Sequence, residues 1–200
     1  EITYTLPDYQ TQCGCADIMM HTMERYFVLE DTMEITDKIA QDVMKNVMKY
    51  AKILKKDPEN YEARAEIMWC GSLSHNGLTG CGTCGGDWAT HLIEHELGGM
   101  FDVAHGAGLA AVWGSWARYV MDEKPERFAQ FAVDVMGVEE SDDVKSTVLK
   151  GIEAVEEFYR MIEMPTNMKE LGINPTDEQI KDMAMKATNH DTQQLGAFKK

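Results

Sequence analysis

Two pairs of potential metal ligands are spaced four residues apart in this sequence. Asp17 precedes His21 by four positions, and His91 precedes His95 by the same interval. On a helix, residues at this spacing project from one face on consecutive turns. His105 follows after a short segment that contains two glycines, so a helical bundle can gather all five side chains around one centre. Carboxylate and imidazole groups in this pattern favour a site for a first-row transition metal.

Other interpretations of these residues remain open from spacing alone. A carboxylate and a histidine four residues apart also occur as a plain surface contact, so Asp17 and His21 do not decide the matter by themselves. The zinc-protease pattern HExxH is absent, because the residue directly after His91 is Leu92 and Glu94 instead directly precedes His95. The case for a metal rests on the two pairs and His105 taken together.

The remaining histidines and the cysteines carry weaker signals. His75 is expected at a helix end, and the His190-Asp191 dipeptide lies among polar residues typical of a solvated helix end. A CxxC sequence spans residues 81–84 and a CxC sequence spans residues 13–15, so a zinc knuckle or a redox pair is an alternative. The odd total of five cysteines favours free thiols.

Residues 80–85 also match the pattern GxGxxG. In dinucleotide-binding folds this pattern follows a strand within a βαβ unit. No alternating strand pattern precedes it here, so we interpret the match as accidental. A dinucleotide would therefore bind mainly elsewhere.

The bulk composition excludes several partner classes. A formal charge of −15, from 19 basic and 34 acidic residues, disfavours binding to nucleic acid or anionic membranes. No apolar run approaches the roughly 20 residues of a membrane span, and no signal peptide is evident, so we expect a cytoplasmic protein. The chain begins with Glu1, which makes it plausible that it is a segment of a longer protein.

Apolar residues recur at helical intervals through almost the whole chain, which predicts an all-α helical bundle formed by one domain over residues 1–200. Helices are expected over about residues 11–29, 35–55, 58–74, 87–97, 105–121, 125–137 and 141–162, and from a capping box at Thr176 and Gln179 onward. The first helix is expected to bury Ile18, Met19, Thr22, Met23, Tyr26 and Phe27. The glycine-rich segment 76–86 is expected to be a loop.

The chain resembles the iron-containing alcohol dehydrogenases, within them the branch of butanol dehydrogenases and broad aldehyde reductases. The similar segments are residues 3–7, 16–21, 87–97, 105–106 and 195–198. The resemblance implies the C-terminal helical, dehydroquinate synthase-like half of such an enzyme, with the nucleotide-binding α/β domain absent. The cysteine-rich segment 81–85 departs from the family pattern.

By this resemblance the metal ligands are Asp17, His21, His91 and His105, and His95 lies near the nicotinamide and substrate, where it relays a proton. The implied cofactors are Fe²⁺ or Zn²⁺ together with NADPH or NADH, bound mainly by the missing N-terminal domain. The implied substrate is a small alcohol or aldehyde, and the full-length enzyme is expected to be a homodimer. We expect the isolated chain to be inactive.

Two other functions follow from the same residues. A helical metallohydrolase is suggested by the clustered histidines and aspartates together with His190-Asp191. A non-catalytic helical interaction module is suggested because no complete enzyme is evident on this chain. Tight metal binding that depends on Asp17 and His91 would separate the dehydrogenase from the interaction module.

Overall fold

The computed structural model describes residues 1–30 and 33–198, and in these it contains eight α-helices, three short 3-10 helices and no strand. The α-helices are α1 (Asp8–Tyr26), α2 (Glu34–Lys56), α3 (Tyr61–His75), α4 (Ala89–Phe101), α5 (His105–Val120), α6 (Pro125–Asp134), α7 (Val144–Met161) and α8 (Asp177–Ala187). The 3-10 helices are η1 (Ile2–Thr5), η2 (Leu78–Gly80) and η3 (Met121–Glu123). The all-α prediction is confirmed.

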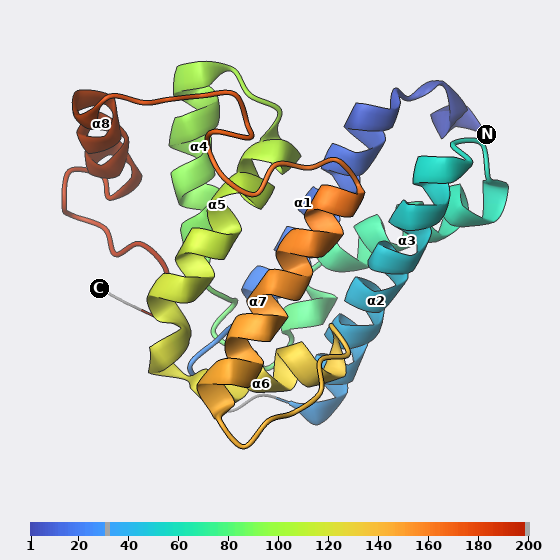
Figure 1. Cartoon of the computed structure of the whole chain (residues 1–200), viewed down its shortest axis with the longest axis horizontal. Coiled ribbons are helices and arrows are strands. Elements are labelled where there is room, and N and C mark those ends of the chain that lie inside the picture. Colours follow the sequence, from blue (N-terminus) through green and yellow to red (C-terminus); the bar gives the residue numbers. More distant parts are fainter. Residues whose placement is uncertain (31–32, 199–200) are drawn as a thin grey trace.

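Helix α1 runs through the middle of the bundle and packs against α2, α3 and α5 (Figure 1). Helix α7 packs on α6 and α5, and α4 packs on α5 and α8. In Figure 1, α2 and α3 lie on one side of α1, α4 and α5 lie on the other, and α8 stands at the outer edge. Within the described residues, no helix is long and apolar enough to span a membrane.

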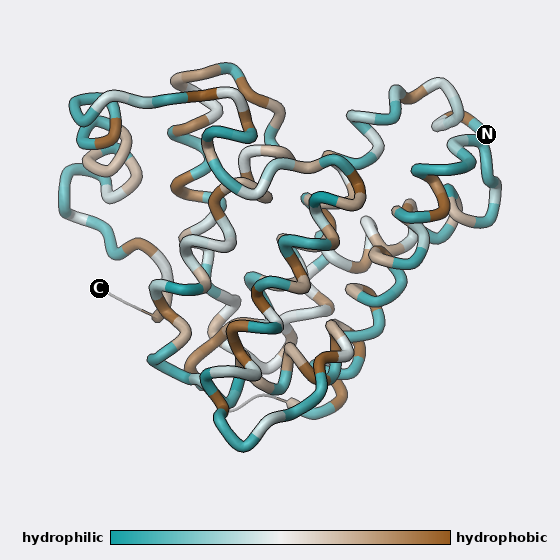
Figure 2. The backbone as a smooth tube through the Cα atoms, in the orientation of Figure 1, coloured by the Kyte–Doolittle hydropathy of each residue, from teal (hydrophilic) through white to brown (hydrophobic). Residues whose placement is uncertain are grey.

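The buried core follows the predicted helical periodicity. Hydrophobic and hydrophilic segments alternate along α7 in Figure 2, as an amphipathic helix requires. All six residues that the first helix was predicted to bury are buried, and the last of them, Phe27, lies directly after α1. Next to the end of α1, the ring of Phe27 stacks on Phe128 with centroids 4.4 Å apart, and Trp113 packs against both Phe27 and Phe131. This aromatic cluster holds α5 and α6 against the end of α1.

The predicted end of α1, near Leu29, lies beyond its observed end at Tyr26. The helix stops at Tyr26 because its carbonyl oxygen accepts hydrogen bonds from Nε and Nη2 of Arg127, at 2.9 and 2.8 Å. The same guanidinium forms a buried bidentate ion pair with Asp37, with N–O distances of 2.6 and 2.7 Å. One arginine on α6 therefore terminates α1 and ties it to α2. The start of α1 at Asp8, directly after Pro7, is earlier than predicted.

Two other predicted boundaries were wrong. Helix α3 does not open at Pro58: it begins at Tyr61, because the Asn60 side chain caps it by accepting from the Ala63 amide at 3.0 Å. Helix α4 does not end at Gly98-Gly99 but continues to Phe101. The predicted capping box of α8 at Thr176 is confirmed.

Glycines on α4 and α5 allow close packing around the buried Glu94. A Cβ atom on Gly98 would lie 3.1 Å from Glu94 Oε1, and one on Gly108 would lie 2.6 Å from the same atom. At the separate contact between α5 and α1, a Cβ on Gly106 would lie 2.9 Å from the Cα of Cys13 and closer still to its carbonyl. The first turn of α5 therefore touches the backbone of α1 directly.

We predict that Gly106→Ala destabilises the protein, because the added methyl group overlaps the α1 backbone, which cannot rotate away. The expected loss is about 1–3 kcal/mol or more in the free energy of unfolding, measured by urea denaturation. The matched control is Gly99→Ala on α4, where a Cβ meets nothing within 4 Å. That variant should be neutral or more stable by up to roughly 1 kcal/mol. Equal stability of the two variants would contradict the described contact.

Candidate metal centre

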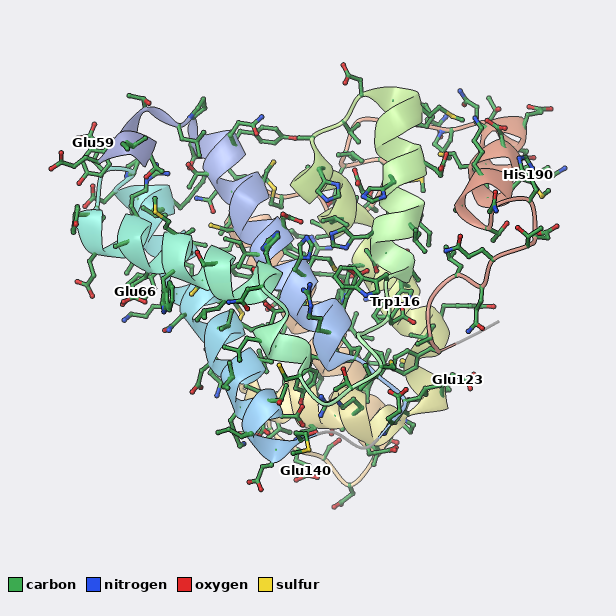
Figure 3. The ribbon with its side chains drawn as sticks, turned by 180° about the vertical axis from the view of Figure 1, so that it is seen from behind. Glu59, Glu66, Trp116, Glu123, Glu140 and His190 are labelled. Atoms are coloured by element: carbon green, nitrogen blue, oxygen red, sulfur yellow. The ribbon has the colours of Figure 1, made fainter. Side chains whose placement is uncertain are left out.

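Three helices bring the predicted ligands together. Asp17 and His21 lie on consecutive turns of α1, His91 lies near the start of α4, and His105 is the first residue of α5. Figure 3 shows α1 beside α4 and α5 in the middle of the molecule. The positions of these side chains therefore depend on the packing of α1 against α5 and of α4 against α5.

One carboxylate oxygen faces three imidazole nitrogens. Oδ1 of Asp17 lies 3.5 Å from Nε2 of His21, 3.6 Å from Nε2 of His91 and 3.5 Å from Nε2 of His105. Each histidine thus directs the same ring nitrogen toward one point. This is one oxygen and three nitrogen donors from residue types that bind divalent first-row metals.

The hydrogen bonding of these atoms fits a metal ion. Among the described residues, Oδ1 of Asp17 and Nε2 of His91 are buried and have no hydrogen-bond partner. Buried polar atoms are nearly always paired, because an unpaired one loses its hydration without compensation. A cation bound by these atoms would supply the missing interaction, so the donor set and its burial fit a divalent metal.

Two buried glutamates hold the opposite nitrogens of two of the rings. Nδ1 of His91 pairs with Oε2 of Glu24, and Nδ1 of His105 pairs with Oε2 of Glu94. Oε1 of Glu24 also accepts from the backbone amide of His91 at 3.1 Å. Carboxylates in this position fix the tautomer and the orientation of metal-binding histidines. Glu24 and Glu94 therefore leave Nε2 of each ring available to the centre. Neither was singled out as a ring partner from the sequence.

The charges in the cluster are strongly coupled. Burial opposes ionisation of Asp17, but the facing imidazoles of His105 and His91 outweigh it and hold the pKa of that carboxyl well below its usual range. Burial opposes protonation of His91, yet Asp17 and Glu24 raise its pKa to about 9. Contacts with Asp17 and Glu94 raise the pKa of His105 to about 10.

His21 behaves in the opposite way, because burial lowers its pKa to about 4. In the metal-free protein, protons on His91 and His105 thus face the negative charge of Asp17. A divalent cation would take over this role and displace protons from the ring nitrogens that it contacts.

His95 lies beside this cluster and not within it. Its side chain is exposed, and its ring lies 5.5 Å from that of His105 and 6.0 Å from that of His91. Donor atoms of Glu94, His95 and His105 also lie within 4.8 Å of one another. We interpret Glu94 in this group as the partner of His105 Nδ1, because the pair is in direct contact.

His75 also reaches the cluster, which the sequence did not indicate. It is the last residue of α3, as predicted, but its Nε2 lies 3.4 Å from Oδ2 of Asp17. Trp88 also borders the histidine cluster, because its ring centroid lies 5.4 Å from the ring centroids of both His21 and His91. The guanidinium of Arg25 covers the Trp88 ring at 4.8 Å.

The other sequence patterns lie outside the centre. Cys81 and Cys84 are exposed free thiols in the loop before α4, and Cys13 and Cys15 are buried free thiols on α1. The GxGxxG match follows a helix, and no strand precedes it in the described part of the chain. His190 is exposed at the outer edge of the molecule beside α8 (Figure 3), which removes the basis for a hydrolase site that includes it.

Two cavities differ in their relation to the cluster. One of about 280 Å³ is lined by Asp17, His105 and Gly106 together with residues of the first turns of α1, and it adjoins the centre directly. A larger apolar cavity of about 540 Å³ lies between α4, α5 and residues 167–168, and none of the clustered histidines lines it. Of the two, the smaller cavity is the one that reaches Asp17 and His105.

Comparison with known proteins decides the family. The model for "Fe-containing alcohol dehydrogenase family, C-terminal" matches residues 11–200. This chain belongs to that family. It is 32% identical over 198 residues to NADH-dependent butanol dehydrogenase A of Clostridium acetobutylicum. The aligned region covers 98% of this chain and 50% of that protein. It is also 31% identical over 194 residues to NADPH-dependent aldehyde reductase YqhD of Escherichia coli, and that aligned region covers 97% of this chain and 49% of the reductase.

Solved structures of this family share the fold. NADH-dependent butanol dehydrogenase A from Thermotoga maritima superposes with a TM-score of 0.89 at 34% identity, covering 98% of this chain and 50% of that one. The substrate- and cofactor-free aldehyde reductase YqhD from E. coli gives a TM-score of 0.90 at 31% identity, with the same coverage. The chain thus spans about half the length of the relatives it matches.

We predict that Glu24→Gln weakens Zn²⁺ binding roughly 10- to 100-fold, because an amide in place of the carboxylate no longer fixes Nδ1 of His91 as a hydrogen-bond donor. The affinity is measured by competition with a chromophoric chelator. Glu140→Gln is the matched control, since Glu140 is exposed at the lower edge of Figure 3. Unchanged affinity in Glu24→Gln would show that this contact does not orient a ligand.

Proposed function

We propose that Asp17, His21, His91 and His105 hold one divalent metal ion, and that this chain is the catalytic helical half of an NAD(P)-linked alcohol dehydrogenase or aldehyde reductase. The observation that carries the proposal is the convergence of three Nε2 atoms on Asp17 Oδ1, at 3.5 to 3.6 Å. Membership of the Fe-containing alcohol dehydrogenase family supports it. The names of the relatives, which are butanol dehydrogenases and an aldehyde reductase, support the substrate class of small alcohols and aldehydes.

The metal ion, when bound, supplies a Lewis acid that polarises an alcohol or carbonyl oxygen for hydride transfer to or from a nicotinamide. Asp17 contributes one negative charge and the three imidazoles bind as neutral ligands, so the centre keeps net positive charge. Glu24 and Glu94 keep two of those imidazoles oriented. Helices α1, α4 and α5 provide a rigid frame for these groups.

His95 is the residue that we propose to carry the proton. It follows His91 by one turn of α4, its side chain is exposed, and its ring stacks beside that of His105. An imidazole at this position can hold a proton next to the substrate oxygen and exchange it with solvent. On family resemblance, we propose that His95 also lies near the nicotinamide ring in the full-length enzyme.

The dinucleotide and its binding domain belong to the other half of the proposed enzyme. This chain spans about half the length of its relatives, and its described residues contain helices but no strand. Because the relatives are named as dependent on NADH or on NADPH, their names support a nicotinamide dinucleotide without selecting either form. We propose that the full-length enzyme is a homodimer, on family resemblance.

The ligand set accommodates iron or zinc. One carboxylate and three imidazoles bind both Fe²⁺ and Zn²⁺, and zinc binds more tightly where the two compete equally. The occupant in a cell then depends on metal supply as well as on affinity. We propose Fe²⁺ as the family metal and Zn²⁺ as its competitor.

The metal proposal is tested by elemental mass spectrometry of the protein purified without added metal. We expect about one iron or zinc ion per chain, and little metal in His91→Ala, since that variant lacks one of the four ligands. His190→Ala, altered at an exposed histidine, should retain the metal. A chain that takes up no metal, even after anaerobic reconstitution, contradicts the proposal.

These 200 residues alone are predicted to lack NADPH-linked aldehyde reduction, because the dinucleotide-binding half is needed to deliver hydride. The assay follows NADPH absorbance with butanal as substrate and with the metal-loaded chain. Normal turnover would show that the nucleotide site lies within this chain.

A further inference from the structure

A groove with three lysines along one wall lies between α2 and α7, and none of the proposed metal ligands lines it. Lys45, Lys49 and Lys52 of α2 form this wall, and we call the feature the lysine groove. The end of α6 borders it as well, and Figure 1 shows α6 beside the lower ends of α2 and α7. The cavity volume of about 430 Å³ falls within the roughly 300–1,000 Å³ of small-molecule sites.

The floor of the lysine groove is apolar and adaptable. Phe158 of α7 is buried and lines it, and Met48, Met136 and Met161 border it from three different parts of the chain. Met161 is 54% exposed, although its side chain is apolar. Methionine side chains are unbranched and flexible, so they adapt to a ligand without a fixed shape. The floor therefore suits a linear aliphatic chain.

The wall on α2 concentrates positive charge. The three lysines follow one another at intervals of four and three residues, so they lie on one face of the helix. Like charges at this spacing repel each other. The chain as a whole carries a formal charge of −15, so three lysines along one groove run against its overall charge. An anion bound there would relieve their repulsion.

The ammonium group of Lys52 lies over the apolar floor. Its Nζ is 5.9 Å from the ring centroid of Phe158, and within residues 1–30 and 33–198 no carboxylate forms an ion pair with it. Glu157 of α7 also lines the groove, so one glutamate stands against the three lysines. Lys52 is therefore free to pair with an anion that enters from solvent.

The other two lysines have weak partners. Nζ of Lys45 lies 3.7 Å from Oδ1 of Asp42 on the same helix, and an ion pair between exposed side chains contributes little stability. Nζ of Lys49 donates to Oη of Tyr50 at 3.0 Å, which leaves its charge uncompensated. Both lysines can therefore add to the attraction for an anion at Lys52.

We propose that the lysine groove binds a free medium-chain fatty acid, with the carboxylate at Lys52 and the aliphatic tail along Phe158 and the methionines. The carboxylate complements the charge of the α2 wall, and a single unbranched tail complements the apolar floor. The proposal does not depend on the metal centre, because the two sites share no residue.

Calorimetric titration of the chain with decanoate tests the proposal, at ligand concentrations below micelle formation. Decanol and decyltrimethylammonium keep the ten-carbon tail and change only the head group. We expect saturable binding of one decanoate per chain, weaker binding of decanol, and no binding of the cation. Octanoate should bind up to roughly 15-fold more weakly, since each buried methylene group contributes up to about a factor of four.

Variants of the wall test the head-group contact. Lys52→Gln should raise the decanoate dissociation constant roughly 2- to 5-fold, as the loss of one exposed ion pair does. Adding Lys45→Gln and Lys49→Gln should raise it to roughly 10-fold or more. The matched control removes the same charge from three exposed lysines that do not line the groove: Lys169→Gln, Lys181→Gln and Lys186→Gln.

A variant of the floor tests the position of the tail. Ala154 is a half-buried residue of α7 that lines the groove, so Ala154→Phe should fill it and abolish decanoate binding while the lysines remain. Circular dichroism and thermal unfolding establish that each variant is folded. If Ala154→Phe does not fold, the lysine variants and their control still decide the outcome.

Four results would overturn the proposal. Equal affinity for decanoate and decanol would show that the lysines do not bind the head group. Equal weakening in the two triple variants would assign the effect to the charge of the whole chain. Binding retained in folded Ala154→Phe would place the ligand elsewhere, such as in the apolar cavity between α4 and α5. A dimer that Ala154→Phe dissociates, detected by size-exclusion chromatography, would show that a second copy of the chain covers the groove.

Discussion

The structure depends on one electrostatic requirement, which is that the partly buried carboxylate of Asp17 faces three imidazole nitrogens from three helices. Two further buried carboxylates, Glu24 and Glu94, stand behind two of these rings. Such a group of charges is costly to bury unless its members are paired or coordinate a metal. The outer contacts fix two of the rings, and the proposed metal ion would satisfy the inner atoms.

The packing of the bundle serves this requirement. The first turn of α5 touches the backbone of α1 at Gly106, which brings His105 close to Asp17. Small residues around Glu94 let α4 and α5 approach closely enough for that glutamate to reach His105. On the far side of the cluster, Arg25 ties the end of α3 to α1. The aromatic cluster around Phe27 stabilises α1 at a distance from the charges.

Much of this arrangement could be predicted from local patterns. The four-residue spacing on α1 and α4 singled out Asp17, His21, His91 and His95, because helical geometry alone places such residues on one face. The separation of His95 from the expected ligands came from the family resemblance. The interpretation of Gly98-Gly99 as a helix end was wrong because these glycines lie in a helix, where Gly98 allows close packing against Glu94. The contacts of Glu24 and His75 with the cluster were missed, because both form between helices that are distant in sequence.

X-ray absorption at the metal edge of the zinc- or iron-loaded chain tests the central claim most directly, because it reports which atoms surround the metal. The account predicts nitrogen and oxygen neighbours at about 2.0–2.2 Å, as expected for three imidazoles and one carboxylate. A sulfur shell at about 2.3 Å would place the metal on the cysteines of the loop before α4 and contradict the account.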